Sequence, residues 1–247
     1  MKILYLLHAP FELPGAIESW AALKGFSQSY VSPYLGEPIP PTSSFDLLIA
    51  MGGPQSPLDP DPYLKDEIAL IREALKANIP VLGFCLGAQL LGEALGARTA
   101  HSPFKEVGVY PIEMTFEGSR DPLLANLPHE FLVTHWHNDM PGLTKDAAVL
   151  AFSPGCPRQI VRYAPHAYGF QCHPEITLQI AHLLLEKCPD ELKPGKYVQS
   201  PKEIVSHDFA GINRNMHRML DNFLSIVEKQ KTKTHKTSPA LKGSNAS

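Results

Sequence analysis

The stretch Pro80-Val81-Leu82-Gly83-Phe84-Cys85-Leu86-Gly87-Ala88-Gln89-Leu90-Leu91 decides how the first half of this 247-residue chain folds. Residues 80–84 are apolar and too few for a helix, which is typical of a buried parallel strand. A sharp turn follows over residues 83–87, and helical spacing resumes over residues 88–95. The stretch therefore predicts a strand, a tight turn and a helix, with Cys85 in the turn.

The same alternation of strands and helices continues around this unit. Residues 1–8 and 45–51 are short apolar runs that indicate buried strands, while 14–24 and 63–77 have the spacing of one-sided helices. This alternation predicts an α/β domain with a mostly parallel central sheet and helices on both faces. Five strand-like runs then indicate a smaller antiparallel sheet, before helices return. The runs are 107–115, 131–136, 149–152, 159–164 and 168–173, and the helices are 176–187 and 212–227.

Composition places the chain among globular proteins, with 44% hydrophobic and 19% charged residues. Lys and Arg number 22 against 25 for Asp and Glu, so the basic excess that nucleic-acid binding requires is missing. No apolar run approaches the roughly 20 residues of a membrane span. Four cysteines are too few for a disulfide scaffold. We therefore expect a cytoplasmic protein that binds neither nucleic acid nor membrane.

Residues 229–247 differ from the rest of the chain. They contain five lysines, no acidic residue and almost nothing to bury. Low hydrophobicity with one sign of charge is typical of disordered segments. The sequence thus predicts a domain over residues 1–228, followed by a disordered basic tail.

Cys85 is the candidate nucleophile because it lies between Gly83 and Gly87 in a G-x-C-x-G pattern. A tight turn between a strand and a helix holds such a side chain clear of the sheet. The free N–H groups at the start of a helix also favour a thiolate over a thiol. A buried, unreactive cysteine is the alternative.

A thiolate nucleophile requires a proton carrier and a group that orients it, and His173 and Glu175 can supply both. In an extended segment, residues two apart face the same side. Glu175 can therefore bind one ring nitrogen of His173 while the other nitrogen faces Cys85. The sequence predicts a Cys-His-Glu triad.

Three motifs occur in the order Met51-Gly52-Gly53-Pro54, then residues 83–91, then His173-Pro174-Glu175. In this order they resemble the class I glutamine amidotransferases, most closely stand-alone members similar to the amidotransferase domain of GMP synthase. The resemblance covers about residues 1–228 and implies a flavodoxin-like α/β fold without a cofactor. It also implies that the cysteine attacks the side-chain amide of glutamine and the histidine, oriented by the glutamate, moves protons. Ammonia then leaves and water hydrolyses the thioester.

The resemblance implies further site residues. The backbone N–H groups of Gly53 and Leu86 would form an oxyanion hole. This fits their positions, since Gly53 follows a predicted strand and Leu86 follows the nucleophile. A plain turn is the alternative for Gly53. Gln89 matches a residue that binds substrate glutamine, and Trp136 and His137 match a segment that borders the glutamine pocket.

His135 and His137 also share one face of a predicted strand, as a pair of metal ligands would. Spacing identifies no third ligand, so the sequence predicts no metal site. The chain also has no phosphate-binding loop of the G-x-x-x-x-G-K-S/T type. The expected partners are therefore glutamine, or another γ-glutamyl compound, and a separate ammonia-accepting synthetase subunit.

Two other functions remain open at this stage. A γ-glutamyl peptidase would use the same triad on γ-glutamyl metabolites, because only the leaving group differs. A regulatory binding module could have kept the fold without catalysis. Comparing turnover of glutamine and γ-glutamyl peptides, and labelling of Cys85 by a glutamine-like electrophile, would separate these possibilities.

Overall fold

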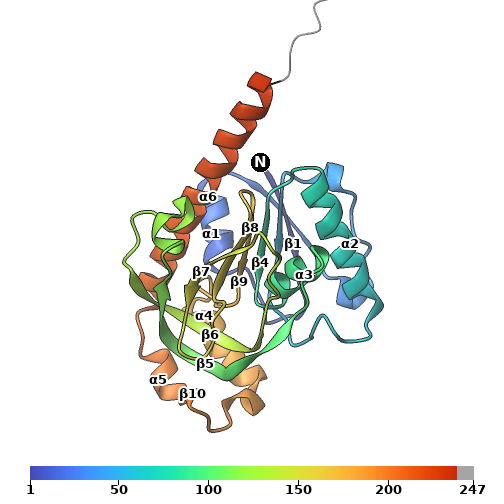
Figure 1. The fold of residues 1–247 in the computed structure, drawn as a ribbon. Coiled ribbons are helices and arrows are strands. Elements are labelled where there is room, and N and C mark those ends of the chain that lie inside the picture. Colours follow the sequence, from blue (N-terminus) through green and yellow to red (C-terminus); the bar gives the residue numbers. More distant parts are fainter. Residues whose placement is uncertain (238–247) are drawn as a thin grey trace, which may run out of the picture.

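The computed structural model describes residues 1–237, in which ten strands form one mixed sheet with helices on both faces (Figure 1). The strand order is β10-β5-β7-β8-β9-β4-β3-β1-β2, and β6 pairs with β5. The strands are β1 (Lys2–Leu6), β2 (Ser27–Val31), β3 (Leu47–Ala50), β4 (Val81–Phe84), β5 (Ala100–Met114), β6 (Glu130–Met140), β7 (Ala148–Phe152), β8 (Ile160–Ala164), β9 (Ala167–Phe170) and β10 (Tyr197–Val198). The helices are α1 (Ala16–Leu23), α2 (Pro62–Lys76), α3 (Leu86–Ala94), α4 (Leu178–Lys187), α5 (Pro201–Val205) and α6 (Phe209–Thr237).

The sheet has a parallel part and an antiparallel part. Strands β2, β1, β3, β4 and β9 are parallel to their neighbours in that order. Strands β8, β7, β5 and β6 continue the sheet in antiparallel fashion. The predicted α/β fold is confirmed. The antiparallel strands are continuous with the parallel ones, because β8 pairs directly with β9.

Both faces of the parallel strands are buried, which explains their continuous apolar sequences. In β1, Ile3 and Tyr5 belong to the core that contains residues of α1 and α6. Leu4 and Leu6 belong to the core that contains residues of α2 and α3. The alternation of side chains along a strand thus assigns one helical layer to each face (Figure 1).

Two elements differ from the predictions. Strand β2 was not predicted, because its sequence Ser27-Gln28-Ser29-Tyr30-Val31 has no continuous apolar run. It lies at the edge of the sheet with β1 as its neighbour, so this strand does not need the continuous apolar run of a central strand.

Helix α6 continues through Thr237, whereas the sequence predicts disorder from residue 229. Extending an existing helix adds one hydrogen bond for each residue fixed, and Lys and Gln have good helix propensity. Residues 229–237 project from the domain as helix (Figure 1), and disorder of the tail stays a prediction. The rest of the predicted tail, 238–247, lies outside the described residues.

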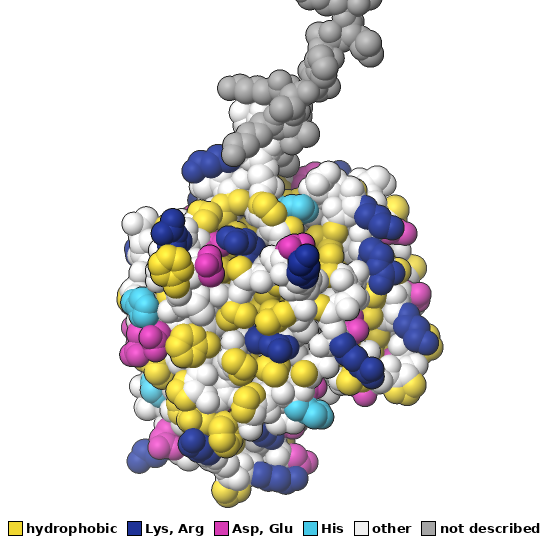
Figure 2. Space-filling model, in the orientation of Figure 1, with side chains coloured by type: hydrophobic (Ala, Val, Ile, Leu, Met, Phe, Trp, Pro, Cys, Tyr) yellow, Lys and Arg dark blue, Asp and Glu magenta, His cyan; other side chains and the backbone are white. Residues whose placement is uncertain are grey.

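Basic and acidic side chains are interspersed with apolar ones on the face shown in Figure 2. This mixture agrees with the small net charge of −3. Within residues 1–237, none of the helices combines the length and the apolar character needed to span a bilayer.

Candidate active site

Cys85 lies in the turn between β4 and α3, where its backbone has φ 49° and ψ −107°. A positive φ is uncommon for a residue with a Cβ and is found disproportionately at functional sites. The Cys85 N–H donates to the carbonyl oxygen of Phe170 in β9 at 2.7 Å, which fixes the turn against the neighbouring strand. The predicted strand, turn and helix are therefore present, with the sulfur beside a cavity.

Neighbouring backbone atoms leave no room for a side chain at the two glycines around this turn. A Cβ at Gly83 would lie 2.3 Å from the carbonyl oxygen of Gly87. A Cβ at Gly87 would lie 2.0 Å from the carbonyl oxygen of Ala50 in β3. Both distances are far below van der Waals contact, so only glycine allows the backbones to approach this closely. The start of α3, and with it Cys85, is thereby held directly against β3.

His173 and Glu175 form a buried ion pair, with Nδ1 of His173 2.7 Å from Oε1 of Glu175. Backbone hydrogen bonds hold both residues. The His173 N–H donates to the Thr134 carbonyl at 2.7 Å, and the Ala16 N–H donates to the Glu175 carbonyl at 2.9 Å. Burial acts against the imidazolium, but Glu175 and Cys85 outweigh it and raise the pKa of His173 well above its usual value. The structure thus brings the predicted imidazole and carboxylate together.

The sulfur of Cys85 is surrounded by polar groups. Nε2 of Gln171 donates to Sγ at 3.3 Å, and the Trp136 carbonyl oxygen lies 3.9 Å from Sγ. Gln171 in turn accepts from Nε2 of Gln89 at 3.1 Å. Nε2 of His173 has no hydrogen-bond partner in the described structure, and Cys85 is close enough to raise the pKa of this ring. Gln171 was not predicted, although it lies two residues before His173 and could have been expected on the same side.

A cavity of about 540 Å³ adjoins the sulfur, within the usual size range of small-molecule sites. Five of the predicted site residues line it: Gly53, Cys85, Gln89, Trp136 and His137. The other three, Leu86, His173 and Glu175, are buried and do not line the cavity. Within residues 1–237, the backbone N–H groups of Gly53 and Leu86 donate to no protein acceptor. Gly53 also lines the cavity, whereas Leu86 does not.

Glu12 is an acidic residue of this cavity that was not predicted from the sequence. It lines the cavity and is 9% exposed. A Cβ at Gly52 would lie 2.6 Å from Oε2 of Glu12 and 3.1 Å from Cε1 of His173, so the carboxyl group and the imidazole approach each other at this glycine. Burial raises the pKa of Glu12, although His173 partly opposes the shift. The loop around Glu12 has no motif that would have identified it.

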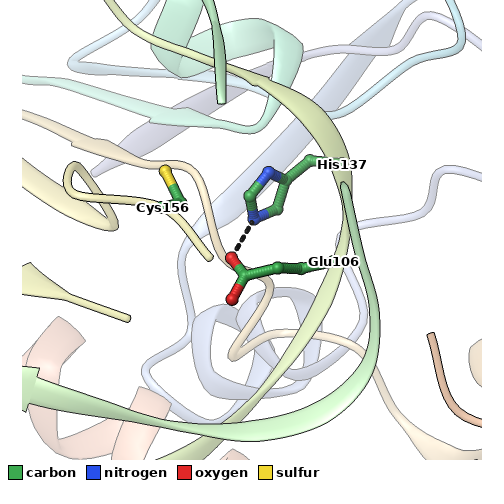
Figure 3. Close-up of side chains that lie close together, drawn as sticks. All are labelled: Glu106, His137 and Cys156. Carbon is green, nitrogen blue, oxygen red and sulfur yellow. Dashed lines mark ion pairs between the residues drawn. The ribbon is translucent and has the colours of Figure 1, made fainter. Parts of the chain in front are cut away.

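His137 connects the cavity wall to a buried polar network. Its Nε2 lies 3.2 Å from Oε2 of Glu106 in β5 (Figure 3). Glu106 also accepts hydrogen bonds from Oγ of Ser153 at 2.7 Å and from Nε2 of Gln159 at 2.6 Å. Burial alone would raise the pKa of Glu106, but His137, His135 and Ser153 outweigh it and lower the pKa. An ionised carboxylate therefore holds His137 from behind the cavity wall.

Among the described residues, Glu106, His137 and Cys156 are the group that could hold a metal ion, with ligand atoms within 4.8 Å of one another (Figure 3). This group contains His137 but not His135, so it differs from the histidine pair that the sequence suggested. Burial raises the pKa of Cys156 to about 11, whereas a metal binds the thiolate. Nε2 of Gln159 also lies 2.6 Å from Oε2 of Glu106 and 3.3 Å from Nε2 of His137. Since a carboxylate accepts, Nε2 of His137 donates to Oε2 of Glu106, and these two candidate ligand atoms already bind each other.

The residues of this site lie in the part of the chain that matches a known family. Residues 32–188 match the family model for glutamine amidotransferase class-I, which is more than half of the chain. The chain belongs to the class I glutamine amidotransferases. The predicted family is confirmed, and this region contains both Cys85 and the His173–Glu175 pair.

Individual glutamine amidotransferases support the same assignment. The chain is 42% identical over 240 residues to the glutamine amidotransferase-like protein YfeJ of Salmonella typhimurium, covering 94% of this chain and 100% of YfeJ. It is 35% identical over 185 residues to the glutamine-hydrolyzing GMP synthase of Aeropyrum pernix. That similarity covers 70% of this chain but 33% of the GMP synthase, so the amidotransferase spans about a third of that enzyme.

Solved structures of other glutamine amidotransferases have the same fold. A glutamine amidotransferase from Thermotoga maritima has a TM-score of 0.82 at 27% identity, over 92% of this chain and 98% of its own. One from Methylobacillus flagellatus has a TM-score of 0.84 at 26% identity, over 92% of this chain and 94% of its own. These similarities confirm the predicted class I amidotransferase fold.

Proposed function

We propose that this amidotransferase hydrolyses the side-chain amide of glutamine through a thioester on Cys85 and releases ammonia. The observation that supports this most is the placement of Cys85 on the cavity, with the buried His173–Glu175 pair close enough to be affected by its charge. A cysteine nucleophile, a proton carrier and a group that orients the carrier are the parts that acyl transfer requires.

The reaction begins when the thiolate of Cys85 attacks the amide carbon and the carbonyl electron pair moves onto oxygen. The imidazolium of His173 gives its proton to the amide nitrogen, the C–N bond breaks and ammonia leaves. Water then gives a proton to His173 as its oxygen attacks the γ-glutamyl thioester. The C–S bond breaks, the electron pair returns to sulfur, and glutamate is released. Glu175 binds Nδ1 throughout, which leaves Nε2 free for both proton transfers.

Both tetrahedral intermediates carry a negative oxygen, which we assign to the N–H groups of Gly53 and Leu86. Their freedom from other hydrogen bonds supports this role. Preorganised N–H donors at such a position each contribute about 10²–10³ in rate. We assign Gln89, Trp136 and His137 to the binding of the substrate, since all three line the cavity.

We further propose that the ammonia is used by a separate synthetase subunit. The chain lacks a phosphate-binding loop of the G-x-x-x-x-G-K-S/T type. The Aeropyrum pernix enzyme to which it is similar is named a glutamine-hydrolyzing GMP synthase, and about two thirds of that protein has no counterpart here. No cofactor takes part in the proposed hydrolysis.

The test is ammonia release from glutamine by the wild-type protein and by Cys85→Ala. We expect Cys85→Ala to lose the activity and keep its circular dichroism spectrum, because the sulfur is the only atom removed. Cys172→Ala is the matched control. The sulfur of Cys172 lies 3.7 Å from the Gln159 carbonyl oxygen and has no role in the proposed mechanism. We expect this control to keep most of the rate.

Three results would contradict the proposal. Activity of Cys85→Ala above a small percentage would exclude Cys85 as the nucleophile. Turnover of γ-glutamyl peptides without turnover of glutamine would make the protein a γ-glutamyl peptidase. Failure of a glutamine-like electrophile to label Cys85, measured by mass spectrometry, would favour a non-catalytic binding module.

A further inference from the structure

The peptide bond between Gly52 and Gly53 carries the N–H that the proposed function assigns to the oxyanion. On its other side, the Gly52 carbonyl oxygen lies 3.1 Å from Nδ1 of His8. This peptide is trans, so its C=O and N–H point in opposite directions. The hydrogen bond from His8 therefore determines the direction of the Gly53 N–H. Gly53 lines the cavity together with Cys85.

Little room is left for a side chain at either residue of this peptide. A Cβ at Gly52 would lie 3.1 Å from Cε1 of His173. A Cβ at Gly53 would lie 2.5 Å from Cβ of His8 and 2.9 Å from Cδ2 of Leu86. Glycine adopts both signs of φ readily, so a peptide between two glycines turns over more easily than others. If it turned over, the Gly52 oxygen would replace the N–H and repel the oxyanion. The site thus requires a group that holds this peptide.

His8 is itself held by a buried ion pair with Glu67. Nε2 of His8 lies 2.8 Å from Oε2 of Glu67, and both side chains are 0% exposed. A carbonyl oxygen accepts hydrogen bonds, so Nδ1 must carry a proton to bind Gly52, while Nε2 is hydrogen-bonded to the carboxyl group of Glu67. Replacing a buried ion pair by apolar residues is often neutral or stabilising. Stability alone is therefore a weak reason for this pair.

We propose that His8 and Glu67 are positioning residues for catalysis, which hold the Gly52–Gly53 peptide with its N–H toward the reacting oxygen. This proposal rests on the proposed function. His8 does not line the cavity, and both of its ring nitrogens are occupied, so it exchanges no proton with the substrate. It acts on the two steps that create an oxyanion, which are formation and hydrolysis of the thioester.

Two reactions of Cys85 separate this role from a general structural one. Glutamine hydrolysis passes through an oxyanion. Alkylation by iodoacetamide does not, because the sulfur forms a bond to a methylene carbon as iodide leaves. Both reactions depend on the Cys85 thiolate beside His173. A displaced Gly53 N–H should therefore slow hydrolysis and leave alkylation unchanged.

The experiment compares two double variants of the full chain. His8→Leu with Glu67→Leu removes the donor without leaving a buried charge unpaired. His8→Asn with Glu67→Gln keeps a side-chain N–H that can reach Gly52. We expect kcat for glutamine to fall roughly 10²–10³-fold in the first, the usual effect of losing one oxyanion donor. KM and the pH profile of Cys85 alkylation should not change, and the second variant should recover most of kcat.

An unchanged kcat in the folded Leu/Leu variant would overturn the proposal, and so would a parallel loss of hydrolysis and alkylation. If the Leu/Leu variant does not fold, His8→Leu with Glu67→Gln replaces it, because this pair also removes the donor to Gly52 without leaving a buried charge, and the same lower kcat at unchanged alkylation is expected. A wild-type protein that is alkylated at Cys85 but releases no ammonia from glutamine would instead contradict the proposed function.

Discussion

Glu175 shows how a single residue of the candidate triad is fixed from several sides. Its carboxylate holds Nδ1 of His173, and its backbone carbonyl accepts a hydrogen bond from the N–H of Ala16, the first residue of α1. The amide of Asn213 in α6 donates to the carbonyl oxygens of Pro174 and Ile176 at 3.0 and 2.9 Å. Two helices distant in sequence therefore orient the residue that orients the imidazole.

At this scale we predict that Glu175→Gln slows ammonia release by up to roughly 10⁴-fold, as when the orienting acid of a triad is neutralised. Glutamine has nearly the same volume, so the fold should persist, but the charge that helps to raise the pKa of His173 is lost. Steady-state kinetics with glutamine measure the effect. The exposed Glu117→Gln is the matched control, and a near-normal rate in Glu175→Gln would remove Glu175 from the mechanism.

At the scale of elements, the position of α3 against β3 determines where Cys85 points. Helix α3 is almost wholly buried, and its first turn meets the end of β3 through Gly87, whose N–H donates to the Met51 carbonyl at 3.1 Å. The same segment after β3 continues into Gly52 and Gly53. One helix-strand contact thus sets the distance between the nucleophile and the glycine loop.

We predict that Gly87→Ala destabilises the protein by at least the roughly 1–3 kcal/mol typical of overpacking, because the added carbon would lie 2.0 Å from the Ala50 carbonyl oxygen. Gly92→Ala in the same helix is the control. Its Cβ would lie 3.2 Å from its nearest neighbours, and alanine adds up to about 1 kcal/mol of helix propensity. Urea unfolding should therefore show a much smaller effect for Gly92→Ala. Equal losses in the two variants would mean that the α3–β3 contact is not the cause.

For the whole molecule, the buried histidine network couples folding to pH. His135 is fully buried, with Nδ1 3.2 Å from Nε2 of Gln159 and Nε2 3.4 Å from the Tyr110 carbonyl oxygen. A neutral ring that accepts at Nδ1 and donates at Nε2 satisfies both contacts. Burial lowers the pKa of His135 to about 3, and the nearby Glu106 carboxylate opposes this shift without cancelling it.

This shift makes the protein less stable in acid. Between pH 6.5, the usual pKa of histidine, and about 3, the unfolded chain binds a proton at His135 that the folded chain does not. The contribution of neutral His135 to the free energy of unfolding is therefore fully present above pH 6.5. It is lost as the pH falls, by up to about 1.4 kcal/mol per pH unit. We predict that the free energy of unfolding of His135→Asn falls less steeply over this range.

Urea unfolding at a series of pH values measures both slopes. The exposed His129→Asn is the control for loss of a histidine elsewhere in the chain. Identical slopes for the wild-type protein and His135→Asn would contradict a neutral, buried His135 in the folded state.

The fold class, the nucleophile turn and the His173–Glu175 pairing could all be predicted from the sequence. Each depends on neighbours a few residues apart: apolar periodicity, glycines around Cys85, and alternation along an extended segment. Strand β2, Glu12 and the placement of Glu106 and Cys156 beside His137 could not be predicted. Their surroundings come from segments far away in the chain, and their own sequences have no local pattern.

The sequence by itself determined which side chains are candidates for the chemistry, because short-range patterns of glycine and apolar residues specify the turn and the strands that present them. Only the tertiary structure decided how those side chains are held. His8 meets Gly52, Glu67 meets His8, and Asn213 meets the backbone beside Glu175 through pairing and packing of separate elements. Such distances depend on how the whole sheet is assembled, which no local stretch of the chain specifies.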